Sequence, residues 1–149
     1  MGLTLALPPS PPSSPSSQGL GYGQNTKAML VTRGLAEMNT FARALGADPG
    51  TLAGLSGVGD VMLTCMGTLS RNQQVGVRLG RGETLAQIGS TMKEVAEGVP
   101  TAPAAVRLAD KLGLDAPICR AVAAVLAGEA TPMQAVRQLM AVPPQEERF

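Results

Sequence analysis

Apolar residues recur every three to four positions along almost the whole chain after residue 25, and this spacing is typical of α-helices. The longest such stretch covers 25–45. Its inward face is expected to hold Val31, Leu35, Met38, Phe41 or Ala42, and Leu45. Asn25 is positioned to cap this helix and Gly46 to end it. The sequence therefore predicts one long helix, which we expect to be the central helix of the fold.

Two opposite charges in this helix, Arg33 and Glu37, are four residues apart. Side chains at this spacing are neighbours on a helix surface, and opposite charges there form weakly stabilising pairs. We expect the pair to lie on the polar side of the helix.

Cap and stop signals divide the rest of the chain into further short helices. The expected starts are Asp48-Pro49 (to about Leu55), the Asp60 segment, Ser70, Thr84, Pro100 with Pro103, Pro117, and Thr131-Pro132. Gly80 and Gly82 are expected to end the helix that starts at Ser70, and Gly113 a later one. No stretch alternates apolar and polar residues as a half-buried strand does. The predicted fold class is all-α: a compact cluster of about seven or eight helices around the 25–45 helix, without coiled-coil heptads.

Composition excludes several classes of function. With 149 residues, 44% of them hydrophobic, the chain can build one domain with a core. A net charge of +1 provides no field that would attract nucleic acid, and one Tyr with two Phe offers no set of platforms for stacked bases. No apolar run approaches the roughly 20 residues that span a bilayer. We therefore expect neither nucleic-acid binding nor a membrane span.

The cysteines indicate neither a metal site nor a redox pair. Cys65 and Cys119 are widely separated, and the chain has no histidine, which excludes a Cys/His zinc site. We expect two buried thiols in a reducing compartment and no bound metal.

Residues 1–18 differ in composition from the rest of the chain, because they are rich in Pro and Ser and carry no charged side chain. Such a segment cannot bury enough apolar surface to fold, so it is predicted to be disordered, with a helical domain over 19–149. A plastid transit peptide is the alternative interpretation, although the segment is short and lacks arginine.

The segment LSGVGDVMLTCMGTLSRN, residues 55–72, has the features of a small-anion site. Asp60 and Thr64 are four apart and share a face if this segment is helical. Ser70 can cap the following helix, whose first N–H groups, dipole and Arg71 fork could all meet one phosphate, with Asn72 as a further short donor. Apolar neighbours make an unpaired Asp60 carboxylate costly, so a fixed partner is expected.

Together with the flanking motifs GYGQNTKAMLVTRGLAEM and EVAEGVPTA, this segment resembles the C-terminal, substrate-binding domain of NAD(P)-dependent glycerol-3-phosphate dehydrogenase, of the short type found in bacteria and plastids. The resemblance runs from about residue 19 to about residue 140, with several motifs in the family's order. It implies the all-α fold of the C-terminal domain of 6-phosphogluconate dehydrogenase-like enzymes.

The resemblance also implies roles for particular residues. The substrate, glycerol 3-phosphate or dihydroxyacetone phosphate, would be bound by Asp60, Thr64, Ser70, Arg71 and Asn72. The cofactor, NAD or NADP, would be contacted by Arg71, Val95 and Glu97. The implied assembly is a homodimer or a pairing with a full-length homologue. The implied compartment is the cytoplasm or a plastid, with no secretion.

Two parts of the family pattern are missing from this sequence. The run Gly19-Leu20-Gly21-Tyr22-Gly23-Gln24 lacks the third glycine of a dinucleotide-binding turn and follows no strand, so no Rossmann domain is predicted here. No lysine precedes Lys27, so the family's catalytic lysine is absent and no catalytic residue is assigned. We expect the domain alone, truncated or separately started, with negligible activity. The alternatives are a sister dehydrogenase for another small phosphorylated or carboxylated substrate, and a non-catalytic helical interaction module.

Overall fold

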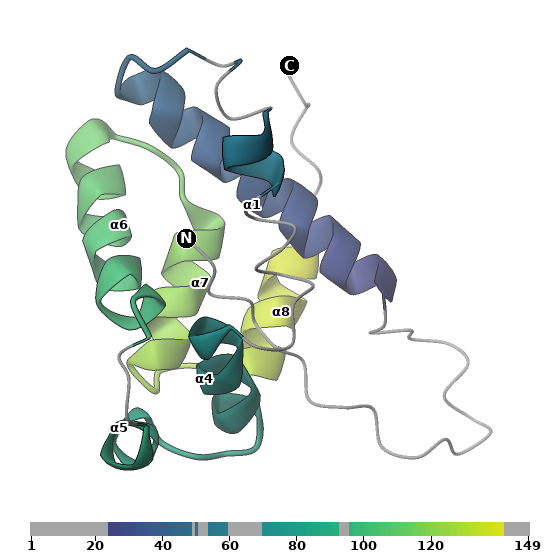
Figure 1. The fold of residues 1–149 in the computed structure, drawn as a ribbon, viewed down its shortest axis with the longest axis vertical. Helices are drawn as coiled ribbons and strands as arrows, with labels where there is room; N and C mark the ends of the chain where they lie inside the picture. The colour runs from purple at the N-terminus through teal and green to yellow at the C-terminus, as the bar shows by residue number, and fades with distance from the viewer. Residues whose placement is uncertain (1–23, 49, 51–53, 60–69, 93–95, 142–149) are drawn as a thin grey trace.

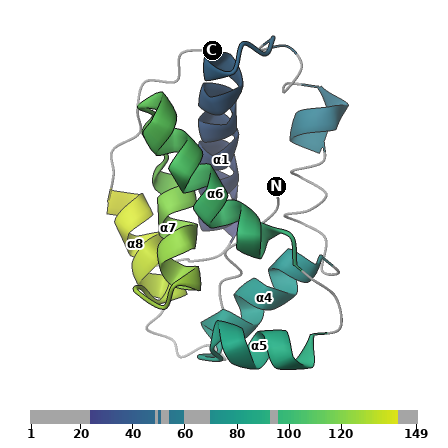
Figure 2. The same ribbon diagram turned by 90° about the vertical axis from the view of Figure 1, so that its left-hand side faces the viewer.

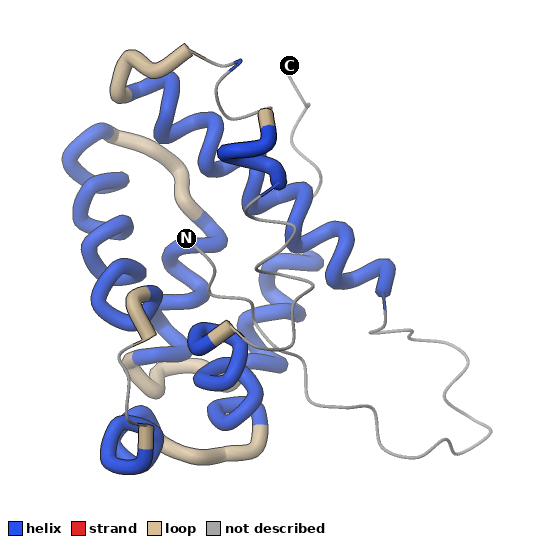
Figure 3. The backbone as a smooth tube through the Cα atoms, in the orientation of Figure 1, coloured by secondary structure: helices blue, strands red, loops and turns tan. Residues whose placement is uncertain are grey.

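The computed structural model describes residues 24–48, 50, 54–59, 70–92 and 96–141, and these residues are helical or in turns. The helices are α1 (Gln24–Ala44), α4 (Arg71–Gly80), α5 (Leu85–Thr91), α6 (Gly98–Leu112), α7 (Pro117–Leu126) and α8 (Pro132–Ala141), with a π-helical turn at Leu55–Gly59. Figure 3 shows no strand among the described residues. The all-α prediction is confirmed. None of the described helices combines the length and apolar character needed to cross a membrane.

Helices α1, α6, α7 and α8 lie together as one group, and α4 and α5 lie as a pair at one end of it (Figures 1 and 2). Helix α7 packs on α1, α6 and α8, while α4 packs on α5 and α8. Within the described residues α7 therefore packs on the most helices, whereas the 25–45 helix was expected to be central. The apolar side chains of α1 are only partly buried, and Leu45, expected inward, is 61% exposed.

Two sets of buried side chains hold the helices together. One centres on Val75, Ile88 and Ala96. The partly buried residues packed on it are Leu79, Leu85, Met92, Val99 and Leu126. On α6, the buried side chains are alanines at 102, 105 and 109, and such small side chains let α7 approach closely. The first set joins α4 and α5 to the start of α6, so the core also fixes the segment around residues 96–99.

Four helices end in the same hydrogen-bonded turn. After α1, Gly46 has φ of 77°, the Ala47 N–H donates to the Ala42 carbonyl at 2.9 Å, and the Gly46 N–H donates to the Arg43 carbonyl at 3.0 Å. This is the Schellman motif, in which glycine takes the left-handed conformation that other residues avoid. The same pattern follows α4, α6 and α7, at Gly82, Gly113 and Gly128. The predicted stops are confirmed, although Gly80 itself is the last residue of α4.

Helix starts follow the local cap signals in three cases. Ser70 Oγ accepts from the Gln73 N–H at 3.1 Å. Thr84 forms a capping box with Gln87. Thr131 and Gln134 exchange the same two hydrogen bonds before α8. These three predicted starts are confirmed.

Two other predicted starts are displaced. Helix α1 already includes Asn25, so this residue is not its cap. Helix α6 begins at Gly98 and contains both Pro100 and Pro103, which were expected to bracket its start. A proline in the first turn removes an N–H that has no acceptor within the helix, which is why α6 tolerates Pro100 there.

The expectation that Arg33 and Glu37 lie on the polar side of α1 is wrong. Glu37 is 8% exposed, and its carboxylate accepts from the Ile118 N–H at 2.7 Å and from the Cys119 N–H at 2.9 Å. Arg33 is partly buried and its Nη1 donates to the Leu139 carbonyl of α8. The pattern of α1 alone could not show this, because the acceptors and donors lie on helices far along the chain.

Replacing Ile88 by alanine is expected to lower the free energy of unfolding by about 3 kcal/mol, because a buried isoleucine loses both its transfer energy and its packing. Ile88 is 1% exposed and packs with Val75 and Ala96. Urea unfolding followed by circular dichroism measures the change. Leu45→Ala, at the exposed end of α1, is the control and should cost less than about 0.5 kcal/mol. Equal losses in the two variants would contradict the described core.

Candidate functional site

The predicted anion-binding residues lie at the start of α4. Ser70 has an extended backbone, with φ of −70° and ψ of 135°, and caps the helix, as predicted. Arg71 and Asn72 are its first two helical residues, and N–H groups at these positions have no acceptor within the helix. Arg71 is exposed and Asn72 partly buried. The arrangement therefore combines a guanidinium with the positive end of a helix dipole.

Asn72 connects this helix start to α6. Its Oδ1 accepts from the Gly98 N–H at 3.0 Å. The residue before Gly98 is Glu97, which is exposed. The structure thus brings together Ser70, Arg71, Asn72 and the backbone of Glu97, although their sequence positions fall in two separate motifs.

Glu97 occupies a turn that is fixed on both sides. Ala96 is buried against Val75 and Ile88, and Val99 packs on the same cluster while its N–H donates to the Ala96 carbonyl at 2.9 Å. Gly98 is buried and held by Asn72. These contacts therefore hold the backbone on both sides of the exposed Glu97 in place.

Three predicted site residues, Asp60, Thr64 and Val95, lie outside the described residues. Their assignment as substrate and cofactor contacts remains a prediction.

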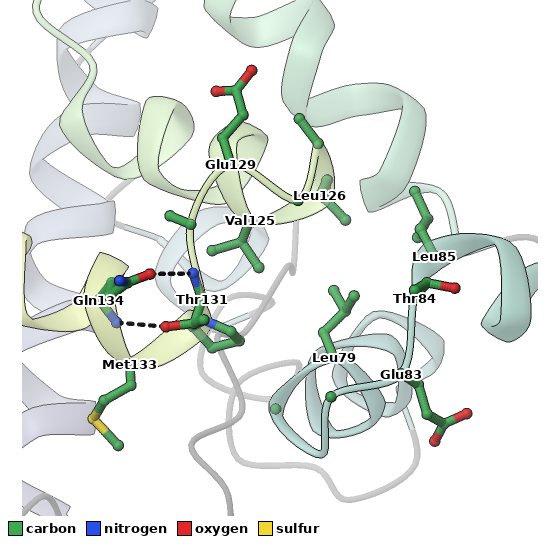
Figure 4. Close-up of a pocket in the computed structure, with 16 residues that line it drawn as sticks. Leu79, Glu83, Thr84, Leu85, Val125, Leu126, Glu129, Thr131, Met133 and Gln134 are labelled. Atoms are coloured by element: carbon green, nitrogen blue, oxygen red, sulfur yellow. Dashed lines mark hydrogen bonds between the residues drawn. The ribbon is translucent and has the colours of Figure 1, made fainter.

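A cavity of about 560 Å³ lies elsewhere, at the other end of α4 (Figure 4). Leu79 points toward Val125 and Leu126 across it, while the carboxylates of Glu83 and Glu129 point outward. Helix α4 has 10 residues, so the cavity is about 15 Å along the helix from Ser70. None of the predicted site residues that the structure describes, Ser70, Arg71, Asn72 and Glu97, lines it. The cavity is therefore separate from the candidate site.

Two ion pairs join charged side chains of the described helices and turns. Arg78 Nε donates to Glu83 Oε2 at 2.8 Å, and this hydrogen bond lowers the pKa of Glu83 from its ordinary value. On α7 the Arg120 guanidinium pairs with Asp110 of α6, which raises the pKa of Arg120. Both pairs neutralise charges within the domain.

Cys119 is partly buried beside Glu37. Burial first, and then the Glu37 carboxylate, raise the pKa of the Cys119 thiol from its ordinary value of 9.0 to about 12. A thiol with this pKa is almost entirely protonated at neutral pH and is a poor nucleophile. Cys119 is therefore a structural residue rather than a catalytic candidate.

The described residues form an all-α domain. The chain belongs to the family described as "NAD-dependent glycerol-3-phosphate dehydrogenase C-terminus", whose family model matches residues 15–137. The resemblance found in the sequence is therefore confirmed.

Curated relatives carry the same enzyme name. A glycerol-3-phosphate dehydrogenase [NAD(P)+] of Geobacter metallireducens is 55% identical over 132 residues, which are 89% of this chain and 39% of the relative. The chloroplastic glycerol-3-phosphate dehydrogenase [NAD(+)] 2 of Arabidopsis thaliana is 50% identical over 129 residues, 87% of this chain and 31% of the relative. The chain thus spans less than two fifths of the length of these relatives.

A solved structure shows the same fold. The crystal structure of glycerol-3-phosphate dehydrogenase (gpsA) from Coxiella burnetii matches with a TM-score of 0.78 and 35% identity, over 85% of this chain and 39% of that chain.

Proposed function

We propose that this domain binds the phosphate group of glycerol 3-phosphate or dihydroxyacetone phosphate in an NAD(P)-dependent glycerol-3-phosphate dehydrogenase. The observation that carries the proposal is the capped start of α4, where Arg71 and Asn72 occupy the first two helical positions. An arginine offers a planar fork that matches a phosphate, and the helix dipole favours the negative charge. Ser70, Asp60 and Thr64 complete the proposed substrate contacts.

The cofactor side is assigned to Glu97 and Val95, with Arg71 between substrate and cofactor. A carboxylate accepts hydrogen bonds from hydroxyl or amide groups and repels phosphates. The exposed Glu97 therefore suits the nicotinamide half of NAD or NADP rather than the pyrophosphate. When bound, the cofactor exchanges a hydride with the substrate carbon. The residues assigned here bind and orient, and we assign the proton transfer to none of them.

Two further features are part of the proposal. The protein is expected to act in the cytoplasm or a plastid, as the bacterial and chloroplastic origins of its relatives suggest. It is expected to work as a homodimer or with a full-length homologue, as the resemblance to the family implies.

Phosphate binding can be tested on the 149-residue chain by NMR titration with glycerol 3-phosphate and inorganic phosphate. One arginine and a few neutral donors should give a dissociation constant of about 1 mM, equivalent to roughly 4 kcal/mol. Arg71→Ala should weaken binding at least about tenfold. Arg81→Ala, an exposed arginine at the other end of α4, is the matched control and should bind as the unmodified chain does.

The titration also separates the alternatives. Glycerol, which lacks the phosphate, should not shift the Arg71 and Asn72 resonances. Stronger binding of a small carboxylate such as lactate than of glycerol 3-phosphate would favour a sister dehydrogenase. Equal loss of phosphate binding in Arg71→Ala and Arg81→Ala would overturn the assignment of the α4 start.

A further inference from the structure

Helix α6 does not cap itself. Its N-cap residue is Glu97, which has helical backbone angles, φ −57° and ψ −24°, and makes no capping hydrogen bond with its side chain. The N–H of the next residue, Gly98, is buried and is satisfied by the Asn72 Oδ1 at 3.0 Å. A buried N–H without an acceptor is costly, so Asn72 supplies a cap that the α6 sequence lacks.

This bond joins two helices that pack mainly on other partners. Helix α4 packs on α5 and α8, and α6 packs on α7. Asn72 lies three and seven residues before Val75 and Leu79, on the α4 face that meets the cluster containing Ala96 and Val99. Asn72, at the N-terminal end of this face, therefore reaches the turn that contains Glu97.

The hydrogen bond also fixes which way the Asn72 amide faces. Only its carbonyl oxygen can accept from an N–H, so the oxygen faces Gly98 and the amide nitrogen lies on the other side of the group. One side chain can therefore hold α6 through its oxygen while its nitrogen donates to an anion at the start of α4.

We propose that Asn72 is a positioning residue for Glu97, linking the substrate side of the site to the cofactor side. The proposal rests on the proposed function for the identity of the two ligands. Ligand binding that restrains Asn72 must then also stabilise the first turn of α6, because coupling between two sites is reciprocal.

Hydrogen exchange of the Gly98 amide, followed by NMR on the 149-residue chain, tests this directly. Asn72→Ala removes the acceptor and should speed the exchange of Gly98 at least about tenfold and shift the Glu97 resonances. Asn72→Asp keeps an acceptor at the positive end of α6 and should leave Gly98 protected, yet it should lose phosphate affinity because it places a carboxylate beside the anion. The Gln87 amide, capped by Thr84 within α5, is the internal reference and should not change.

Inorganic phosphate supplies the second arm of the experiment. In the unmodified chain, phosphate should slow Gly98 exchange. In Arg71→Ala, the response of Gly98 exchange to phosphate should disappear. If phosphate binds the unmodified chain without changing the exchange rate of the Gly98 amide, the proposed link between the substrate side and the cofactor side is wrong.

The two proposals fail in different ways. If the unmodified chain does not bind phosphate, the proposed function fails, while the Gly98 and Glu97 signals in the two Asn72 variants still decide the positioning role. If Gly98 exchange and the Glu97 resonances are the same in Asn72→Ala as in the unmodified chain, the positioning role is wrong. Should Asn72→Ala fail to fold, loss of Gly98 protection in Asn72→Asp would overturn the proposal, and retained protection would support it.

Discussion

Replacing Glu37 by alanine is expected to lower the free energy of unfolding by about 3 kcal/mol, a large share of the stability of a domain of this size. Glu37 is 8% exposed, and its carboxylate accepts from two backbone N–H groups in the first turn of α7, those of Ile118 and Cys119. The variant loses two charge-assisted hydrogen bonds at the positive end of a helix, and it leaves both donors without an acceptor. Urea unfolding followed by circular dichroism gives the measurement.

A graded pair of controls separates this effect from a general loss of charge. Glu37→Gln keeps one acceptor oxygen and should lose roughly half as much stability. Glu129→Ala, at an exposed position after α7, should change the free energy of unfolding by less than about 0.5 kcal/mol. If Glu37→Ala were as stable as Glu129→Ala, the two hydrogen bonds that Glu37 accepts would not be what stabilises the start of α7.

The helix ends that the sequence predicted correctly are ones whose stabilising groups are close along the chain. Ser70, Thr84 and Thr131 bond to N–H groups three residues later, and Gly46 closes the turn of its own helix. A short pattern of residue types contains both partners of such bonds. These ends could therefore be found without any knowledge of how the helices pack.

The caps of α6 and α7 could not be found in this way, because their partners are 26 and 81 residues apart. Glu37 has the spacing of a surface ion pair, and the resemblance gave Asn72 only a ligand contact. One local signal was present: Ala116 precedes Pro117 at the start of α7 and has no side-chain acceptor. A predicted helix whose start lacks Ser, Thr, Asp or Asn needs a cap from elsewhere in the fold.

The candidate site was predicted in part for the same reason. The start of α4 is local, so Ser70 could be placed as its cap from the residues alone. The proximity of Glu97 was expected from the family resemblance, and its physical cause is the hydrogen bond from Gly98 to Asn72. That bond depends on the packing of Ala96 and Val99 against Val75, which no local pattern reveals.

Cys119 is expected to react with iodoacetamide at pH 8 about a thousand times more slowly in the folded chain than an ordinary thiol, because only the thiolate is nucleophilic. Burial and the Glu37 carboxylate raise its pKa from 9.0 to about 12, three units, so the thiolate fraction falls by this factor. Mass spectrometry of the tryptic peptide 112–120, which contains Cys119 and not Cys65, measures the rate. Unfolding in urea should restore ordinary reactivity.

The same shift sets the sign of a pH effect on stability. A folded-state pKa above the unfolded one means that the unfolded chain releases this proton first as the pH rises. The contribution of Cys119 to the free energy of unfolding is therefore fully present below pH 9 and is lost as the pH rises toward 12.

Glu37→Gln removes the carboxylate but keeps a side chain of the same size. It should therefore speed alkylation of the folded chain toward the rate that burial alone allows, whereas Glu129→Ala should leave that rate unchanged. Fast alkylation of Cys119 in the folded, unmodified chain would show that the thiol does not lie in the closed environment between α1 and α7.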